Sequence, residues 1–158
     1  MKKHVLSILV NNEPGVLAKI SGMFYRRNFN IDTISVGSSE KYNHSRIIIV
    51  FSGSESEFEQ LIKQLHKLID VVKITKLENN PLLRELCLIK IKYDSSKIRD
   101  DLISYSQVYK NKIIDISNDT ITIQVVGNHK KVNNFIKLIS KYKIKEIART
   151  GITGMNRG

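Results

Sequence analysis

The sequence predicts an α+β protein made of two βαββαβ modules in tandem. Three observations lead to this prediction. The strand and helix patterns of residues 1–78 follow that order, residues 85–158 repeat it, and a turn-forming Asn-Asn-Pro at 79–81 lies between the two. A chain of 158 residues is long enough for two small domains. We therefore expect one domain at 1–78, a linker at 79–84 and a second domain at 85–158.

The first module shows clear periodicities. Its strands are expected at residues 4–10, 31–36, 45–51 and 71–77, the third of them buried on both faces or nearly so. A helix is expected directly after Pro14 and Gly15, where apolar residues begin to recur at helical spacing. A second helix follows Ser54 to Glu57, which match a capping box. This order is the ferredoxin-like signature, which predicts four antiparallel strands with both helices on one face.

The second module repeats the order with more polar interruptions. Its strands are expected at residues 85–93, 112–117, 120–126 and 144–152, and its helices at 95–108 and around 132–139. The single cysteine, Cys87, lies in an apolar run and is expected to be a buried strand residue, since a free cysteine packs as a small hydrophobe. We therefore expect a second ferredoxin-like domain.

Composition and charge narrow the setting of the protein. No secretory cleavage pattern follows the N-terminus, and the strongly apolar run at 47–51 is too short to span a bilayer, so we expect a cytoplasmic protein with no membrane association. The net charge of +11 raises the question of nucleic-acid binding. The lysines are scattered, however, and the expected sheet carries few aromatic residues for stacking RNA bases. We expect no nucleic-acid partner.

Recognisable catalytic patterns are missing from the sequence. The four histidines have no metal-ligand spacing to another histidine, a cysteine or a carboxylate, so no metal site is expected. Phosphate-binding and dinucleotide-binding glycine motifs and the nucleophile motif of hydrolases are also missing. We therefore expect a binding module with no catalytic residues of its own.

A polar turn offers the best candidate for a ligand site. The first strand ends in N-N-E-P-G, directly before a helix whose N-terminal N–H groups and partial positive charge suit a carboxylate. Asn12 and Asn30 each offer an amide donor and acceptor, and Gly15 lets a ligand approach the backbone. The aliphatic side chains expected to line the pocket are Val16, Leu17 and Ile31. The alternative from the pattern alone is an ordinary turn and a strand cap.

The stretch from His4 to Gly37, HVLSILVNNEPGVLAKISGMFYRRNFNIDTISVG, resembles the N-terminal ACT domain of an acetolactate synthase (acetohydroxyacid synthase) small subunit. The similarity continues through Gln64–Val71 and through the late A-R-T-G at Ala148–Gly151, so it covers nearly the whole chain. These two segments distinguish this family from ACT domains that are fused to other enzymes.

The resemblance implies a regulatory subunit. Its partner would be a separate catalytic subunit that carries thiamine diphosphate, FAD and Mg and condenses two pyruvates in branched-chain amino-acid synthesis. The small subunit would raise that activity and mediate feedback inhibition by valine, bound between the ACT domains of a homodimer. The matching effector-binding positions are Asn12, Gly15, Val16, Leu17, Asn30 and Ile31. The alternative is a stand-alone ACT-domain amino-acid sensor that regulates another enzyme or transcription.

Overall fold

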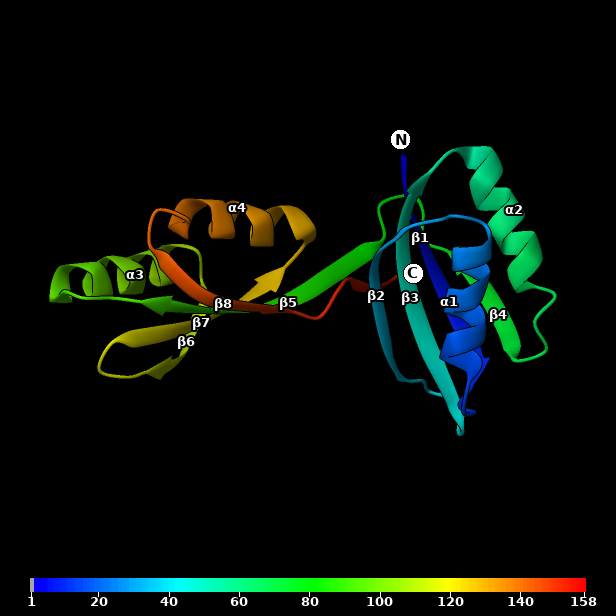
Figure 1. Ribbon diagram of the computed structural model, residues 1–158, viewed down its shortest axis with the longest axis horizontal. Helices are drawn as coiled ribbons and strands as arrows, with labels where there is room; N and C mark the ends of the chain where they lie inside the picture. Colours follow the sequence, from blue (N-terminus) through cyan, green and yellow to red (C-terminus); the bar gives the residue numbers. More distant parts are fainter. Residues whose placement is uncertain (1) are drawn as a thin grey trace. The chain divides into compact units, whose positions relative to one another are not determined.

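The computed structural model describes residues 2–158 and divides the chain into two compact units (Figure 1). The first unit runs to Leu82 and also includes Ile152–Gly158, and the second is Leu83–Gly151. Each contains an antiparallel sheet with two helices, so the predicted fold class of two βαββαβ modules is confirmed. Hydrogen bonds join residues 152–158 to the first unit, and the short strand β9 (Thr153–Met155) within this segment pairs with β5. None of the helices in residues 2–158 is long and apolar enough to cross a membrane.

The first unit has a four-stranded sheet with strand order β2-β3-β1-β4. Its elements are β1 (Lys2–Asn11), α1 (Val16–Arg26), β2 (Ile31–Ser38), β3 (His44–Gly53), α2 (Glu55–Leu65) and β4 (Val71–Lys76). Both helices lie on the same face of this sheet (Figure 1). The capping box predicted at the start of α2 is present, because the Ser54 hydroxyl accepts from the Glu57 N–H and the Glu57 carboxylate accepts from the Ser54 N–H.

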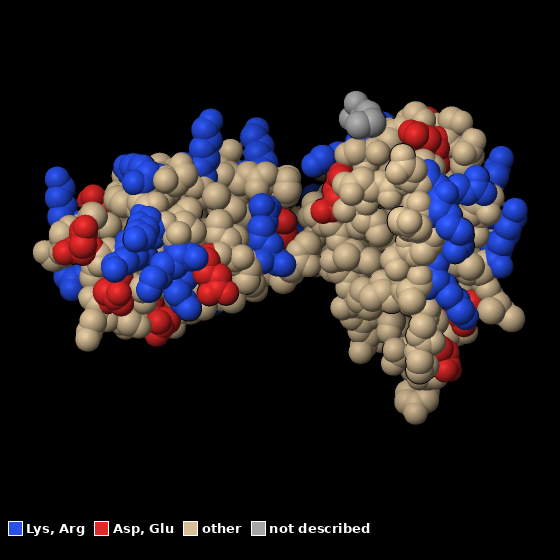
Figure 2. Space-filling view, in the orientation of Figure 1, with Lys and Arg blue, Asp and Glu red and all other residues tan. Residues whose placement is uncertain are grey.

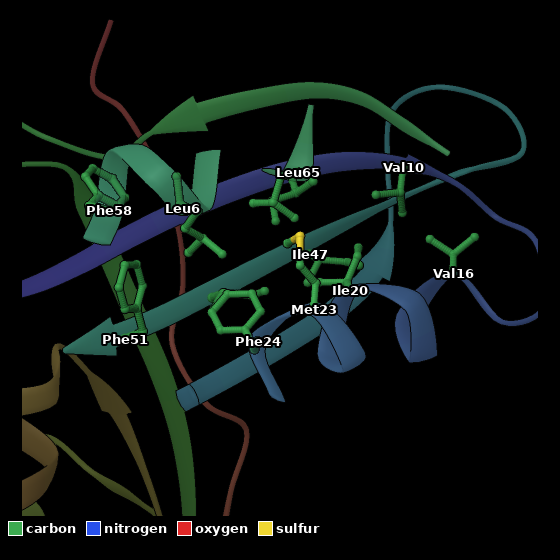
Figure 3. Packing of buried hydrophobic residues seen from close by; sticks show 13 residues of the cluster. Leu6, Val10, Val16, Ile20, Met23, Phe24, Ile47, Phe51, Phe58 and Leu65 are labelled. Carbon is green, nitrogen blue, oxygen red and sulfur yellow. The ribbon is translucent and has the colours of Figure 1, made fainter. Parts of the chain in front are cut away.

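The core of the first unit lies between its sheet and its helices. Alternating residues of β1 and β3 point toward the helices and meet the apolar stripes of α1 and α2. Val10 and Val16 lie at one end of this cluster, and Phe51 and Phe58 lie at the other (Figure 3). Ile48 and Val50, on the opposite face of β3, are each only 2% exposed, as expected for a strand buried on both faces. The core therefore packs beneath both ends of the sheet, and the candidate site residues lie at these ends.

The second sheet has the strand order β6-β7-β5-β8, and the short strand β9 also pairs with β5. The elements of the second unit are β5 (Leu82–Lys92), α3 (Ser96–Val108), β6 (Lys112–Ile116), β7 (Thr120–Gly127), α4 (His129–Ile139) and β8 (Lys143–Arg149). Cys87 is buried in its core, as predicted, and burial raises the pKa of the Cys87 thiol. β8 ends at Arg149 and not at 152, because Gly151 takes a left-handed backbone conformation with φ of 79° that interrupts the strand.

One carboxylate is buried in the second unit. The Glu85 side chain is 1% exposed, and its Oε1 accepts a hydrogen bond from Arg149 Nη2 at 2.5 Å. His129 Nδ1, at the start of α4, lies 3.4 Å from the same oxygen. A buried charge requires such partners, because an unpaired carboxylate would lose its hydration without replacement. The cluster therefore ties β8 and α4 to β5.

Candidate effector-binding site

The turn between β1 and α1 is held by backbone hydrogen bonds. The Asn11 N–H donates to the Asp70 carbonyl and the Asn12 N–H donates to the Asn43 carbonyl, both at 2.9 Å. The next three residues, up to Gly15, are exposed. The turn is therefore fixed by its backbone while its side chains and its helix start remain open to solvent.

The N-terminus of α1 differs from the other helix starts. Gly15 is the N-cap and has φ of 85°, in the left-handed region, so no side chain caps the helix. The first turn of α1 contains no acidic residue either. By contrast, α2, α3 and α4 are each capped by a serine or asparagine side chain. The Val16 N–H donates to the Glu13 carbonyl at 3.4 Å, and the open end of α1 otherwise presents the partial positive charge and backbone N–H groups that suit a carboxylate.

The predicted apolar residues divide between core and surface. Val16 is 4% exposed and belongs to the core cluster, where it packs below the turn. Leu17 is 46% exposed. Ile31 is half-buried and packs against the core from the start of β2. Leu17 and Ile31 therefore retain apolar surface for a ligand or partner, whereas Val16 supports the turn from beneath.

Asn30 lies directly before β2 and is oriented by neighbours that the sequence analysis did not select. Its Nδ2 donates to Asp32 Oδ1 at 3.3 Å, and Asp32 Oδ2 accepts from the Ser52 hydroxyl at 2.7 Å. Residues two apart on a strand lie on the same face, and this spacing in N-I-D was the available signal. Asp32 holds the donor end of the Asn30 amide, which leaves its carbonyl oxygen turned toward other partners.

A single chain keeps the two halves of the candidate site apart. Asn11 pairs with His44 at the start of β3, whereas Ile31 pairs with Phe51 near its end. Seven residues of antiparallel strand span about 24 Å. The turn with Asn12 and Gly15 therefore lies at one end of the sheet, and Asn30 lies at the other end.

Positively charged side chains lie near both ends of α1. Lys19 lies in the first turns of α1, where its Nζ is 2.7 Å from Asp70 Oδ2, and Arg26 lies in the last turn. Figure 2 shows Lys and Arg side chains along the helix face of the first unit. No group of three or more histidine, cysteine or acidic residues within residues 2–158 could hold a metal ion. The available chemistry is that of amides, backbone N–H groups and apolar surface, which suits a small zwitterion.

The fold and this site define the class of protein. Two ferredoxin-like modules in tandem, the first with an open glycine turn before its first helix, make a chain with an N-terminal ACT domain. A family model described as an AHAS small subunit-like ACT domain matches residues 6–73, and a model for the small subunit of acetolactate synthase matches residues 84–158. The chain belongs to the family of acetolactate synthase small subunits, as the sequence resemblance predicted.

Relatives over the whole chain agree with this assignment. The chain is 42% identical to a probable acetolactate synthase small subunit of Methanothermobacter thermautotrophicus, with 98% of this chain and 93% of the relative covered. It is 40% identical to the acetolactate synthase small subunit of Mycolicibacterium smegmatis, with 98% and 91% covered. The crystal structure of the small subunit from Thermotoga maritima superposes with a TM-score of 0.94 at 40% identity, with 100% and 99% covered.

Proposed function

We propose that this chain is the regulatory subunit of acetolactate synthase. It activates the thiamine-diphosphate-dependent catalytic subunit and mediates feedback inhibition by valine in branched-chain amino-acid synthesis. The thiamine diphosphate, FAD and Mg of the reaction belong to that catalytic subunit. Membership in the small-subunit family supports the partner. The candidate site has two half-sites, the turn with Asn12 and Gly15 and the start of β2 with Asn30. Their geometry supports the effector site and carries the proposal.

The observation that carries it is the position of the half-sites at opposite ends of an edge strand. β2 lies at the edge of the sheet and begins at the end that carries Asn30. Its other end, Ser38, pairs with Ser45, next to the end of β1. If two copies pair their β2 edges antiparallel around a two-fold axis, Asn30 of one copy reaches the sheet end that carries the Gly15 turn of the other. Such a homodimer completes two equivalent sites.

Each polar group then has a defined role. The carboxylate of the effector binds the open N–H groups at the start of α1, beside Gly15. Asn12 from the same copy and Asn30 from the second copy hold its polar groups, the ammonium binding to an amide carbonyl oxygen. The aliphatic side chain packs between Leu17 and Ile31. A ligand that bridges two copies stabilises one arrangement of the dimer, and a coupling of about 1–3 kcal/mol changes activity about 5–150-fold.

The test is reconstitution with the catalytic subunit. The purified chain is added to that subunit with and without valine, and acetolactate formation is measured. We expect the chain to raise the rate and valine to reverse that increase. Calorimetry on the chain alone is expected to give one valine per half-site pair, two per dimer. The proposal fails if the chain neither changes the rate nor binds the catalytic subunit.

A matched pair of variants tests the bridging geometry. Asn12→Ala and Asn30→Ala each remove one amide, and each alone should weaken valine binding because both contribute to every site. Mixing the two single variants regenerates one site without either substitution in a heterodimer, while the second site carries both. In a 1:1 mixture about half of the dimers pair one variant with the other, so recovery of about a quarter of the wild-type valine sites is expected for a two-chain site. No recovery would show that both amides act within one chain.

A further inference from the structure

The seven C-terminal residues cross the first unit on the sheet face that lies away from its helices. The carbonyl of Ile152 accepts a hydrogen bond from the Ser35 hydroxyl at 3.0 Å, and its N–H donates to Thr33 Oγ1 at 3.4 Å. Ser35 pairs with Ile48 and Thr33 with Val50, neither of which belongs to the helix-facing core. Ile152 itself is 7% exposed. This end of the segment is therefore anchored to edge strand β2.

The other end of the segment is anchored at the opposite edge of the sheet. Asn156 Nδ2 donates to the carbonyl of Lys76, the last residue of β4, at 3.0 Å. Its Oδ1 accepts from the Glu78 N–H at 3.3 Å. The Asn156 amide thus bonds one backbone carbonyl and one backbone N–H, as a neighbouring strand would. Arg157 Nε donates to the Asn80 carbonyl at 2.9 Å. The segment is thus joined to both edge strands, since the strand order is β2-β3-β1-β4.

The length of the segment matches the width that it crosses. Three interstrand spacings separate β2 from β4, which is about 14 Å. Four residue steps from Ile152 to Asn156 reach about 14 Å when extended, and the middle of the segment is the short strand β9 (Thr153–Met155). The segment therefore has almost no slack, and a shift of β2 relative to β4 must move it. We name residues Ile152–Arg157 the strap.

The strap begins where the chain leaves the second unit. Gly151 adopts φ of 79°, and directly before it Thr150 is held by two bonds to Leu86 of β5: the Thr150 N–H donates to the Leu86 carbonyl, and the Leu86 N–H donates to Thr150 Oγ1, each at 3.1 Å. The residues on both sides of Gly151 are therefore fixed, one in each unit. Movement of Ile152 is passed to Thr150 through Gly151, and β9, the middle of the strap, also pairs directly with β5.

We propose that the strap couples the effector site to the second unit. β2 starts next to Asn30, and its Thr33 and Ser35 hold the strap, so effector binding at Asn30 displaces β2 and, through the taut strap, Thr150 and β5. This proposal rests on the proposed function, because it needs an effector at the start of β2. It assigns to the strap a role in transmitting the effector signal and none in binding the effector.

Two variants test the strap in the complex with the catalytic subunit. Ser35→Ala combined with Asn156→Ala removes an anchor at each edge. Insertion of two glycines between Gly154 and Met155 keeps the hydrogen-bonding residues at both edges, interrupts β9 and its pairing with β5, and adds about 7 Å of slack. The control is Ser38→Ala, the same substitution on the same strand outside the strap. Thermal unfolding followed by circular dichroism establishes that each variant is folded, and the insertion remains informative if the double variant is not.

We expect both strap variants to bind valine within about threefold of the wild-type Kd by calorimetry and to activate the catalytic subunit. The ratio of the uninhibited to the inhibited rate at saturating valine should fall toward one in both, while the control keeps the wild-type ratio. An unchanged ratio in the glycine insertion overturns the strap proposal and leaves the proposed function standing. Loss of valine binding in the insertion also overturns it, because the strap would then shape the site. A wild-type chain that neither binds valine nor is inhibited by it refutes the proposed effector and the strap coupling together.

Discussion

Replacement of Gly15 by aspartate places a second carboxylate at the helix start where the effector carboxylate is proposed to bind. A side chain is sterically tolerated here, because an added Cβ meets no atom within 4 Å. The left-handed backbone of Gly15 costs a non-glycine residue about 1–2 kcal/mol, which is small beside the about 5–15 kcal/mol that stabilises a domain. The variant should therefore fold, and its effect on valine should be local.

The size of that effect follows from Coulomb's law. Two carboxylates about 5 Å apart repel by about 3 kcal/mol at an effective dielectric constant of about 20. Exposure of the turn to water and salt reduces this to about 2 kcal/mol, which weakens valine binding about thirtyfold. The aspartate also accepts hydrogen bonds from the helix N–H groups and so competes with the ligand. Feedback inhibition should be strongly reduced at valine concentrations that just suffice to inhibit the wild type.

Gly15→Asn is the matched control. Asparagine has nearly the shape of aspartate, tolerates the left-handed region and carries no charge. Calorimetry on both variants separates the backbone effect from the charge effect, and we expect asparagine to weaken valine binding several-fold less than aspartate. Equal Kd values for the two variants would refute the electrostatic reasoning. A wild-type Kd for Gly15→Asp would show that valine does not bind at this helix start.

Three further predictions concern other parts of the chain. Asp32→Ala frees the Asn30 amide and should weaken valine binding about two- to tenfold in calorimetry, the worth of one hydrogen bond, without loss of activation. Glu85→Ala should lower the free energy of unfolding in urea by about 2 kcal/mol, because it leaves the partly buried Arg149 without its carboxylate partner. The control Glu146→Ala breaks the exposed pair with Lys90 and should change that free energy by less than about 0.5 kcal/mol. Equal effects would contradict the assignment of the buried pair. Cys87 should resist iodoacetamide until the protein unfolds, and rapid alkylation of the native protein would contradict its burial. Because burial raises the pKa of the Cys87 thiol, the unfolded state ionises at lower pH than the folded state. Stability should therefore fall as the pH rises above the pKa of the unfolded thiol.

Most of the fold could be predicted because its signals are local. The apolar spacing from Val16 to Phe24 and the capping box at Ser54 each reflect contacts within one helix, and the structure has α1 and α2 there. The alternation and continuous apolar runs of the strands were equally local signals. The end of the last strand of the second unit was the exception. Ile144, Ile147 and the β-branched Thr150 continue the strand pattern up to Gly151, so the pattern alone favoured a longer strand than the one that ends at Arg149.

The candidate site was only partly accessible to this reasoning. The glycine turn was visible because its residues are adjacent, and its uncapped helix start followed from the lack of a serine, threonine, asparagine or aspartate at Gly15. Asp32 and Ser52 were not selected, because they are 20 residues apart and come together only when β2 pairs with β3. The burial of Val16 also depends on how α1 packs against the sheet. The helical pattern alone does not show that Val16 is buried while the neighbouring Leu17 is exposed.

The amino-acid sequence by itself determined the element order, the family and the chemical character of the turn, because each depends on neighbouring residues and on their identity. Tertiary structure alone decided two further points. The register of β3 against β1 and β2 put Asn12 and Asn30 at opposite ends of one sheet, and for this reason the proposed site is built from two copies. The return of Ile152–Gly158 to the first unit was decided by hydrogen bonds to Ser35 and Lys76, more than 75 residues away along the chain. Such long-range contacts leave no periodic trace in the sequence, because no local propensity specifies them.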